Sequence, residues 1–331
     1  MFNVLIVGVG SIGERHLRAF RATGRAAVAL CETDEARRQE VSRRCQVDRC
    51  YGDLEAAASD ADHRFDAAVI ATPAPLHVSM AERLARAGVH LLIEKPLSTT
   101  LEGTDDLVKV VAENRILAAV AYVCRAHPAL QAMRQALADD RFGKPVQLVA
   151  VTGQHFPTYR PAYRATYYTR RETGGGAIQD ALTHVINMGE YLVGPVDRVT
   201  ADGAHQIIED VEVEDTAHVL ARHGDVLGSY ALNQYQAPNE STITVVCARG
   251  TARFEMHRHR WLSMTEPGAD WDEEEVFAGD RDAVFVNQAN HFLDAVEGKS
   301  PPLCSLADGL HTLRVNLAVL AAAQAPPFTL L

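Results

Sequence analysis

The chain of 331 residues is long enough for two ordinary domains, and its composition, 47% hydrophobic and 23% charged, is close to the average of globular proteins. These values exclude collagen-like, coiled-coil and disordered chains. Asp and Glu number 43 against 32 Lys and Arg, and the resulting net charge of −11 makes nucleic acid an unexpected partner, because its phosphates would be repelled.

No apolar stretch approaches the roughly 18 to 20 residues of a membrane span, so we expect no membrane role. The apolar run at residues 3–9 has none of the features of a secretory signal, which predicts a cytoplasmic protein. Six cysteines occur without a C-x-x-C pair. We expect free thiols, neither disulfides nor metal ligands.

Residues 1–124 alternate short β-branched runs with segments of helical period, which predicts a parallel sheet with helical crossovers. Gly24 and Gly88 follow two of the helices, where helices commonly end. The pattern predicts a doubly wound α/β domain. The expected strands are 3–9, 26–31, 65–71, 89–93 and 116–123, and the expected helices are 12–23, 35–45, 76–87 and 101–114.

Residues 125–331 follow a different pattern, in which strands are joined by short turns after a first helix at 127–138. This predicts an α+β domain with a large, mostly antiparallel sheet, open on one face or covered by a partner. The expected strands are 145–153, 196–203, 213–221, 227–233, 241–247 and 251–256. The expected helices are 177–192, 286–297 and 306–323.

The sequence Gly8-Val9-Gly10-Ser11-Ile12-Gly13 follows the first strand and opens the first helix. In this context the glycines allow a tight turn, backbone approach to a pyrophosphate and close helix packing, while the helix N-terminus binds the anion. Glu32 ends the second strand and can bind both ribose hydroxyls. NAD is therefore favoured over NADP, although Arg37 and Arg38 keep NADP open.

Two further motifs follow later strands: Ala71-Thr72-Pro73 with His77, and Glu94-Lys95-Pro96. With Gly174-Gly175-Gly176, Asp180 and His184 in the second half, the chain resembles the glucose-fructose oxidoreductase and inositol dehydrogenase (Gfo/Idh/MocA) family. The resemblance implies an N-terminal Rossmann domain and an open-sheet domain that assembles a homodimer or homotetramer. Its implied cofactor contacts are Gly8, Gly10, Ser11, Ile12, Gly13, Glu32, Thr72, Pro73, His77, Glu94, Lys95 and Pro96.

The same resemblance implies that Lys95, Asp180 and His184 are catalytic, with a cis Lys95-Pro96 bond. Chemically, His184 suits removal of a hydroxyl proton, and the Lys95 ammonium suits stabilisation of the alkoxide. Lys95 as the base remains an alternative. Ala74 and Asn187 depart from the family pattern, where an asparagine and an acid are common.

Residues 154–171 contain four tyrosines and four arginines, a composition that suits a polyhydroxylated ligand or a grip on a neighbouring subunit. Arg125 and His127 are expected to touch substrate or to cap the following helix. His257 and His259 lack a third ligand for a metal, and the acidic run 270–275 is expected to be an exposed loop. The candidate substrate contacts are Arg125, His155, Tyr159, Arg160 and Tyr163.

These features predict an NAD-dependent dehydrogenase that oxidises a secondary hydroxyl of a sugar, an inositol-like polyol or a sugar acid. Two alternatives stay open. One is a redox-neutral enzyme of the same family that uses NAD transiently in glycoside cleavage or epimerisation. The other is a sensor that binds NAD without catalysis.

Overall fold

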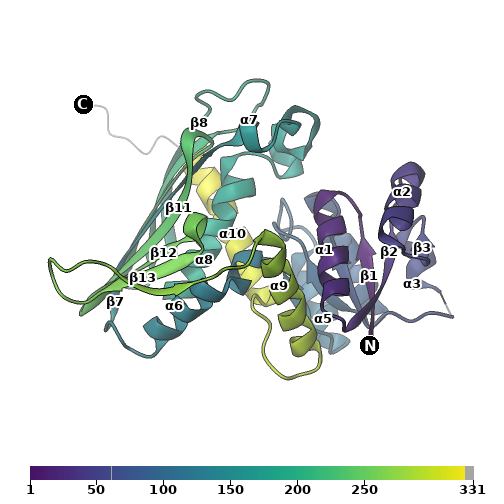
Figure 1. Ribbon diagram of the computed structural model, residues 1–331. Helices are drawn as coiled ribbons and strands as arrows, with labels where there is room; N and C mark the ends of the chain where they lie inside the picture. The colour runs from purple at the N-terminus through teal and green to yellow at the C-terminus, as the bar shows by residue number, and fades with distance from the viewer. Residues whose placement is uncertain (61, 325–331) are drawn as a thin grey trace. The chain divides into compact units, whose positions relative to one another are not determined.

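A computed structural model describes residues 1–60 and 62–324 of the chain, which divides into two compact units (Figure 1). Of the described residues, unit 1 contains those in the ranges 1–126 and 279–310, and unit 2 those in the ranges 127–278 and 311–324. Residues 325–331, which the sequence analysis assigned to the second domain, lie outside the described residues. In the described part of the chain, no helix has both the length and the apolar character that a membrane crossing needs.

Unit 1 is built on a parallel sheet of six strands in the order β3-β2-β1-β4-β5-β6. This confirms the predicted doubly wound α/β fold. The edge strand β3 is too short for its sequence pattern to predict. The strands are β1 (Phe2–Val7), β2 (Ala26–Cys31), β3 (Cys50–Tyr51), β4 (Ala67–Ile70), β5 (His90–Ile93) and β6 (Ala118–Val120).

Helices connect these strands, and Gly24 and Gly88 have positive φ angles of 67° and 77° after two of them, as predicted. The short α3 is an addition to the prediction. The helical segments are α1 (Ser11–Ala22), α2 (Glu35–Cys45), α3 (Leu54–Ala58), η1 (Ala74–Leu76), α4 (His77–Arg86), α5 (Thr104–Glu113) and η2 (Val123–Ala126).

The segment 279–310, expected in the second domain, packs into unit 1. Its helix α9 (Arg281–Val296) buries Phe285 and Phe292 in the core cluster that also holds Phe20 of α1. The rings of Phe20 and Phe292 meet edge to face at 6.1 Å between centroids. A helical period predicts the apolar face of α9 but not which core buries it. The division into a cofactor domain and a substrate domain stays a prediction.

Unit 2 contains an eight-stranded sheet in the order β14-β13-β12-β11-β7-β10-β9-β8. Of the described strand pairs in it, β7 with β10 is the parallel one, so the predicted mostly antiparallel sheet is confirmed. The strands are β7 (Pro145–His155), β8 (Arg198–Ala204), β9 (Thr216–His223), β10 (Val226–Asn233), β11 (Tyr235–Cys247), β12 (Gly250–Glu255), β13 (Arg260–Met264) and β14 (Asp272–Val276).

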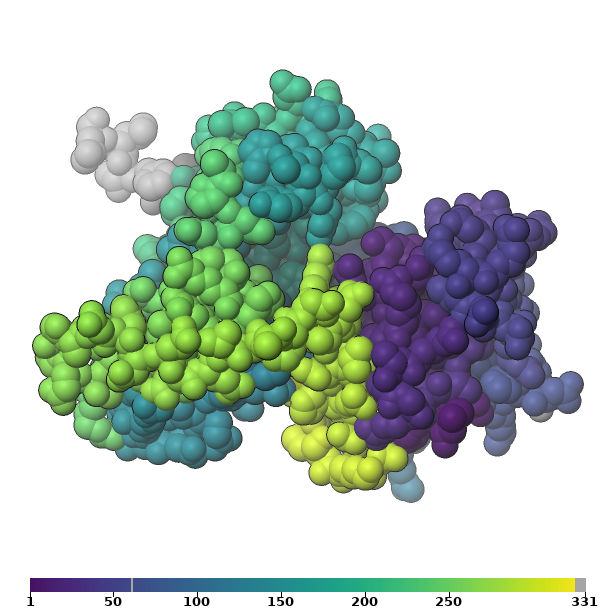
Figure 2. Space-filling view, viewed as in Figure 1, coloured from purple at the N-terminus to yellow at the C-terminus, as the bar shows by residue number. Residues whose placement is uncertain are grey.

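The acidic run 270–275 was expected to be an exposed loop, and this prediction is wrong. Most of the run forms the edge strand β14, which pairs with β13. Two acidic residues of the run pair with arginines: Arg260 lies 2.5 Å from Glu273, and Arg141 pairs with Glu274. Charged edge strands resist pairing with other chains. The preceding loop, residues 265–270, is exposed, in yellow-green in Figure 2.

The helices of unit 2 are α6 (Pro128–Ala138), the short α7 (Phe156–Tyr159), the π-helix η6 (Ala177–Leu182), α8 (Thr183–Val193) and α10 (Leu306–Gln324), which begins in unit 1. Short 3-10 turns complete the segment after β7. They are η3 (Tyr163–Ala165), η4 (Tyr167–Thr169) and η5 (Arg171–Thr173). A further 3-10 turn, η7 (Met256–Arg258), follows β12. Contacts of α8 with β7 and β10, and of α6 with β12 and β13, cover one face of the sheet.

Candidate active site

The motifs of unit 1 meet at one edge of its sheet, because the carboxyl ends of parallel strands lie together. The backbone N–H of Glu94 donates to the carbonyl of Ile70 at 2.9 Å, which joins the ends of β5 and β4. Dinucleotides bind at such an edge in open α/β sheets. The residues placed there are Gly8 after β1, Glu32 after β2, Ala71 and Thr72 after β4, and Glu94 and Lys95 after β5.

The three glycines of the first loop have different structural roles. Gly8 has a φ of +81°, which favours glycine. A Cβ on Gly13 would lie 1.8 Å from the carbonyl oxygen of Gly8, so Gly13 is required for helix packing. A Cβ on Gly10 would meet no described atom within 4 Å. The open space at Gly10 adjoins the N-terminus of α1, where a pyrophosphate fits.

We therefore expect Gly10→Ala and Gly13→Ala to fail in different ways. Gly10 has a φ of −65°, which alanine adopts readily, so this variant should melt like the wild type and lose NAD affinity by about tenfold or more. Gly13→Ala should lose about 1 to 3 kcal/mol or more of stability through overpacking. Thermal melting and NAD titration by fluorescence separate the two effects. Wild-type NAD affinity in Gly10→Ala would contradict the assignment.

Glu32 is fixed at the end of β2 with its carboxylate buried. Its Oε2 accepts from the N–H of Val9 at 3.1 Å, and its Oε1 accepts from the N–H of Asp34 at 3.0 Å. Arg37 lies 3.6 Å from the carboxylate, and Arg38 donates to the carbonyl of Glu32 at 2.7 Å. Both arginines thus face Glu32. The fixed carboxylate fits a ribose with free hydroxyls and disfavours a 2′-phosphate.

His77 joins the two later motifs. Its buried ring places Nε2 2.7 Å from the carbonyl of Thr72 and Nδ1 3.0 Å from the carbonyl of Pro96. Burial lowers the pKa of His77, although both carbonyls favour the protonated ring. Because both nitrogens face carbonyls of this chain, His77 positions the loops that hold Thr72 and Pro96, and the predicted direct cofactor contact has no support from this geometry.

Lys95 stands at the end of β5 beside a buried carboxylate. The Lys95-Pro96 peptide is cis, as the family resemblance implies. Glu94 lies 2.6 Å from Nε2 of His16 and accepts from the backbone N–H of Lys95 at 2.9 Å. Burial raises the pKa of Glu94, but the hydrogen bond from His16 and the charges of His16 and Lys95 outweigh it and leave the pKa lowered. Glu94 therefore supplies a fixed negative charge next to Lys95.

The triple glycine of unit 2 packs against this chain's own atoms. A Cβ on Gly175 would lie 2.1 Å from the carbonyl of Tyr168, and one on Gly176 would lie 2.6 Å from Glu214. Glu214 also accepts from the N–H of Ile178 at 3.0 Å and so caps η6. Sequence reasoning missed Glu214, since no local signal connects it with a helix 36 residues earlier.

Asp180 and His184 lie on a helix that changes type between them. Asp180 belongs to the π-helix η6, and His184 is the second residue of α8. Both side chains are partly buried, and Nδ1 of His184 is enclosed. The hydroxyl of Tyr167 donates to Oδ1 of Asp180 at 2.7 Å. Single π-helical turns are frequent at functional sites. The sequence analysis predicted one helix over 177–192 and did not predict its π-helical first part.

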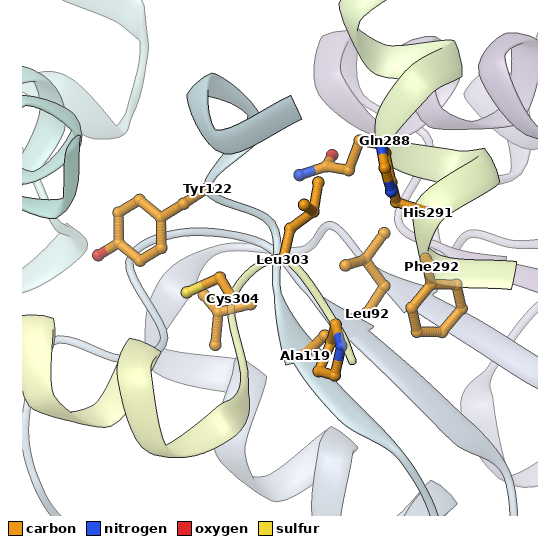
Figure 3. A pocket seen from close by; sticks show the side chains of 10 residues that line it. Leu92, Ala119, Tyr122, Gln288, His291, Phe292, Leu303 and Cys304 are labelled. Carbon is orange, nitrogen blue, oxygen red and sulfur yellow. The ribbon is translucent and has the colours of Figure 1, made fainter. Parts of the chain in front are cut away.

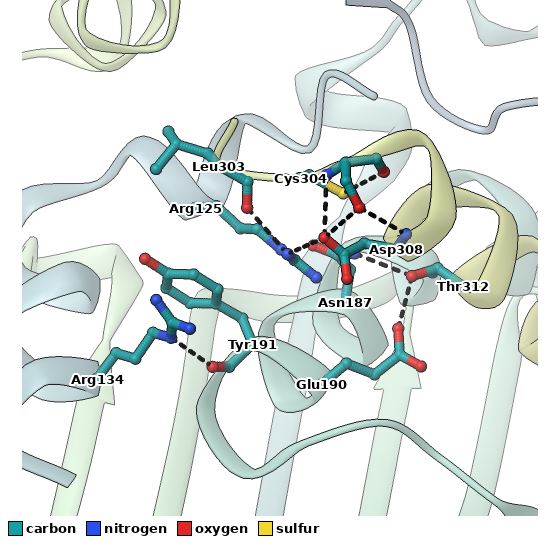
Figure 4. A network of polar contacts seen from close by, with 10 residues as sticks. Arg125, Arg134, Asn187, Glu190, Tyr191, Leu303, Cys304, Asp308 and Thr312 are labelled. Atoms are coloured by element: carbon teal, nitrogen blue, oxygen red, sulfur yellow. Dashed lines mark hydrogen bonds and ion pairs between the residues drawn. The ribbon is translucent and has the colours of Figure 1, made fainter. Parts of the chain in front are cut away.

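Asn187 anchors the helix that carries His184 (Figure 4). Its Nδ2 donates to the hydroxyl of Thr312 on α10 at 2.9 Å, and Thr312 in turn donates to Glu190 at 2.5 Å. Asn316 adds a second tether, donating to the hydroxyl of Thr183 at 2.6 Å. The departure from the family pattern at Asn187 is therefore a structural contact between α8 and α10.

The predicted substrate contacts separate into exposed and buried residues. Tyr163 is 2% exposed and its hydroxyl donates to the carbonyl of Glu209 at 2.9 Å, so it is a core residue and its predicted ligand contact is corrected. His155, Tyr159 and Arg160 are exposed. Burial of an aromatic ring depends on distant partners, which composition does not reveal.

Arg125 is also buried and structural, against the prediction. Its guanidinium donates to the carbonyl of Leu303 at 2.9 Å and lies 3.5 Å from Asp308 (Figure 4). His127 precedes α6 without a side-chain cap and places Nε2 3.2 Å from Nδ1 of His259. Burial lowers the pKa of His127 to about 4, so its ring is neutral at physiological pH.

The histidines of the 257–259 segment do not share one strand face, because the chain turns there and His259 has a φ of +52°. Within residues 1–60 and 62–324, no group of three or more His, Cys, Asp or Glu could hold a metal. All six cysteines are free thiols.

Unit 1 also contains a small hollow lined by Leu92, Tyr122, Gln288 and Phe292 among others (Figure 3). Its volume of about 10 Å³ suits a single water molecule and excludes a sugar. Oε1 of Gln288 is buried there and has no hydrogen-bond partner among the described residues. The hollow is therefore a feature of the core.

Known families match both parts of the chain. Residues 2–122 match the family described as "Oxidoreductase family, NAD-binding Rossmann fold", and residues 130–253 match the "GFO/IDH/MocA C-terminal domain". The chain belongs to the Gfo/Idh/MocA family and is an NAD-dependent oxidoreductase. The predicted family, fold class and cofactor are confirmed.

Relatives align over nearly the whole chain. UDP-N-acetylglucosamine 3-dehydrogenase of Acidithiobacillus ferrooxidans is 27% identical, over 97% of this chain and 96% of its own. D-apiose dehydrogenase of Paraburkholderia graminis is 28% identical, over 98% and 88%. The WlbA dehydrogenase of Bordetella pertussis, solved with NADH and UDP-GlcNAcA, is 25% identical with a TM-score of 0.83, over 98% and 95%.

Proposed function

We propose that the protein oxidises a secondary hydroxyl of a sugar, an inositol-like polyol or a sugar acid, and that NAD accepts the hydride. The observation that carries this proposal is the position of Lys95, which follows β5 at the same sheet edge as the glycine loop and Glu32. The dehydrogenase relatives, which are named for UDP-N-acetylglucosamine and D-apiose, support this substrate class.

In this proposal Lys95, Asp180 and His184 act on one substrate hydroxyl. NAD supplies the hydride acceptor when it is bound. His184 takes the hydroxyl proton, and the Lys95 ammonium stabilises the oxygen as negative charge develops. Asp180 binds an adjacent hydroxyl or orients its neighbours. His155, Tyr159 and Arg160, which are exposed, are the proposed substrate contacts.

The proposal is tested with a panel of myo-inositol, neutral aldoses, uronic acids and UDP-N-acetylglucosamine. Each is mixed with the protein and NAD, and NADH absorbance is followed. Stoichiometric NADH with one member is expected. Conversion of a substrate without net NADH would favour the redox-neutral alternative. Ligand binding without any turnover would favour the sensor.

We also propose that the open face of the unit 2 sheet is covered by a second copy of the chain, in a homodimer or homotetramer. Val151, Leu220 and Leu227 are exposed on β7, β9 and β10, and a hollow of about 410 Å³ adjoins the last two. An open apolar sheet face is a liability unless a partner covers it.

Light scattering at micromolar concentration is expected to give a multiple of the 36.1 kDa chain mass. Leu220→Arg and Leu227→Arg together should shift the particle to the single-chain mass, because two buried charges would oppose the interface. A single-chain mass for the wild type would contradict the proposal. Free thiols and NAD dependence support a cytoplasmic location, which we infer as well.

A further inference from the structure

The hydroxyl of Tyr167 reaches the carboxylate of Asp180 from the tyrosine-rich arm, residues 154–171. The 2.7 Å hydrogen bond joins two residues 13 positions apart, one on the 3-10 turn η4 and one on the π-helix η6. The neighbouring tyrosines of the arm do not contact a carboxylate in this way. Tyr163 donates to a backbone carbonyl, and the hydroxyl of Tyr168 has no hydrogen-bond partner among the described residues. Tyr167 thus couples the arm to Asp180.

The backbone of Tyr167 is held in place from both sides. Its neighbour Tyr168 is 1% exposed and packs against Phe156 with 4.2 Å between ring centroids, inside an apolar cluster. The hydroxyl of Thr173 donates to the carbonyl of Tyr167 at 2.5 Å. These contacts already fix the arm at this point, so presenting the Tyr167 hydroxyl to Asp180 costs little further ordering entropy.

The Tyr167 side chain differs from its buried neighbours in exposure. It is 50% exposed, although its hydroxyl is engaged with Asp180. A hydrogen bond donated to a carboxylate favours the ionised form and fixes its orientation. The exposed ring can also pack against the C–H surface of a sugar.

We propose that Tyr167 is a positioning residue that orients the Asp180 carboxylate toward the substrate hydroxyls. This inference rests on the proposed function. It assigns the arm a role in catalysis, through Asp180, that its composition alone did not identify. The competing explanation is that the hydrogen bond only stabilises the fold by tying the arm to η6.

Tyr167→Phe removes the hydroxyl and keeps the ring. On the substrate of the panel that gives the most NADH, we expect kcat/KM to fall by about ten- to a hundredfold, the range for a hydrogen bond to a charged group. NAD affinity and melting temperature should stay at wild-type values. In an Asp180→Asn background the same change should cost less than about threefold, because the group it orients is already altered.

Tyr51→Phe is the matched control, since Tyr51 donates to Asp60 at 2.6 Å within unit 1 and should leave turnover unchanged. A loss in Tyr167→Phe that is equal in both backgrounds, or that comes with a lower melting temperature, would assign a structural role and overturn the inference. Wild-type kcat/KM in Tyr167→Phe would overturn it as well. If the wild-type protein oxidises no member of the panel, the proposed function itself fails, and this inference with it.

Discussion

His184→Ala is expected to lower turnover by ~10² to 10⁴, the range for loss of a general base, while NAD affinity stays unchanged. The unperturbed pKa of histidine lies near neutrality, so its imidazole can take a proton at physiological pH. His184 stands early in α8, which Asn187 and Thr183 tether to α10 through Thr312 and Asn316. These two contacts fix the position of α8, and with it the position of the His184 ring.

The measurement is steady-state turnover from pH 5 to 9 with the active member of the panel. The wild-type kcat/KM should fall on the acid side as the base becomes protonated, and His184→Ala should lose that limb. His63→Ala, a histidine in a loop of unit 1, is the control and should match the wild type. Near wild-type turnover in His184→Ala would show that the proton goes elsewhere, with Lys95 as the next candidate.

Lys95→Ala is expected to lower turnover by ~10² to 10³, because it removes the charged donor to the developing alkoxide. The buried carboxylate of Glu94, the residue before Lys95, would also lose the positive charge beside it. Lys95→Arg restores a positive charge there, so this variant should recover part of the turnover. The fold should tolerate both substitutions, because the Lys95 side chain is only partly buried after the end of β5.

Turnover and NAD titration are compared with those of Lys109→Ala, an exposed lysine on α5 paired with Glu113 at 3.9 Å. The control should keep both values. If Lys95→Ala loses NAD affinity as strongly as turnover, Lys95 serves cofactor binding and not the alkoxide. If it loses neither, the assignment of Lys95 as a catalytic residue is wrong.

Local sequence patterns predicted most of unit 1. The glycine loop, Glu32 and the Glu94-Lys95-Pro96 motif are local patterns, and each lies directly after a strand whose β-branched run predicts it. Because parallel strands bring their carboxyl ends to one edge, the predicted strand ends were enough to place these motifs together. Lys95-Pro96 is cis, as the family resemblance implies.

The roles of residues whose partners lie far away in the sequence became visible only in the folded chain. Tyr163 and Tyr167 stand four positions apart in the same arm, yet one is a core residue and the other reaches Asp180. Glu214 caps a helix that starts 37 residues earlier, and α9 packs in unit 1. Periodicity and composition report that a side chain is apolar or polar. Which residue such a side chain contacts depends on long-range contacts, and those exist only in the folded chain.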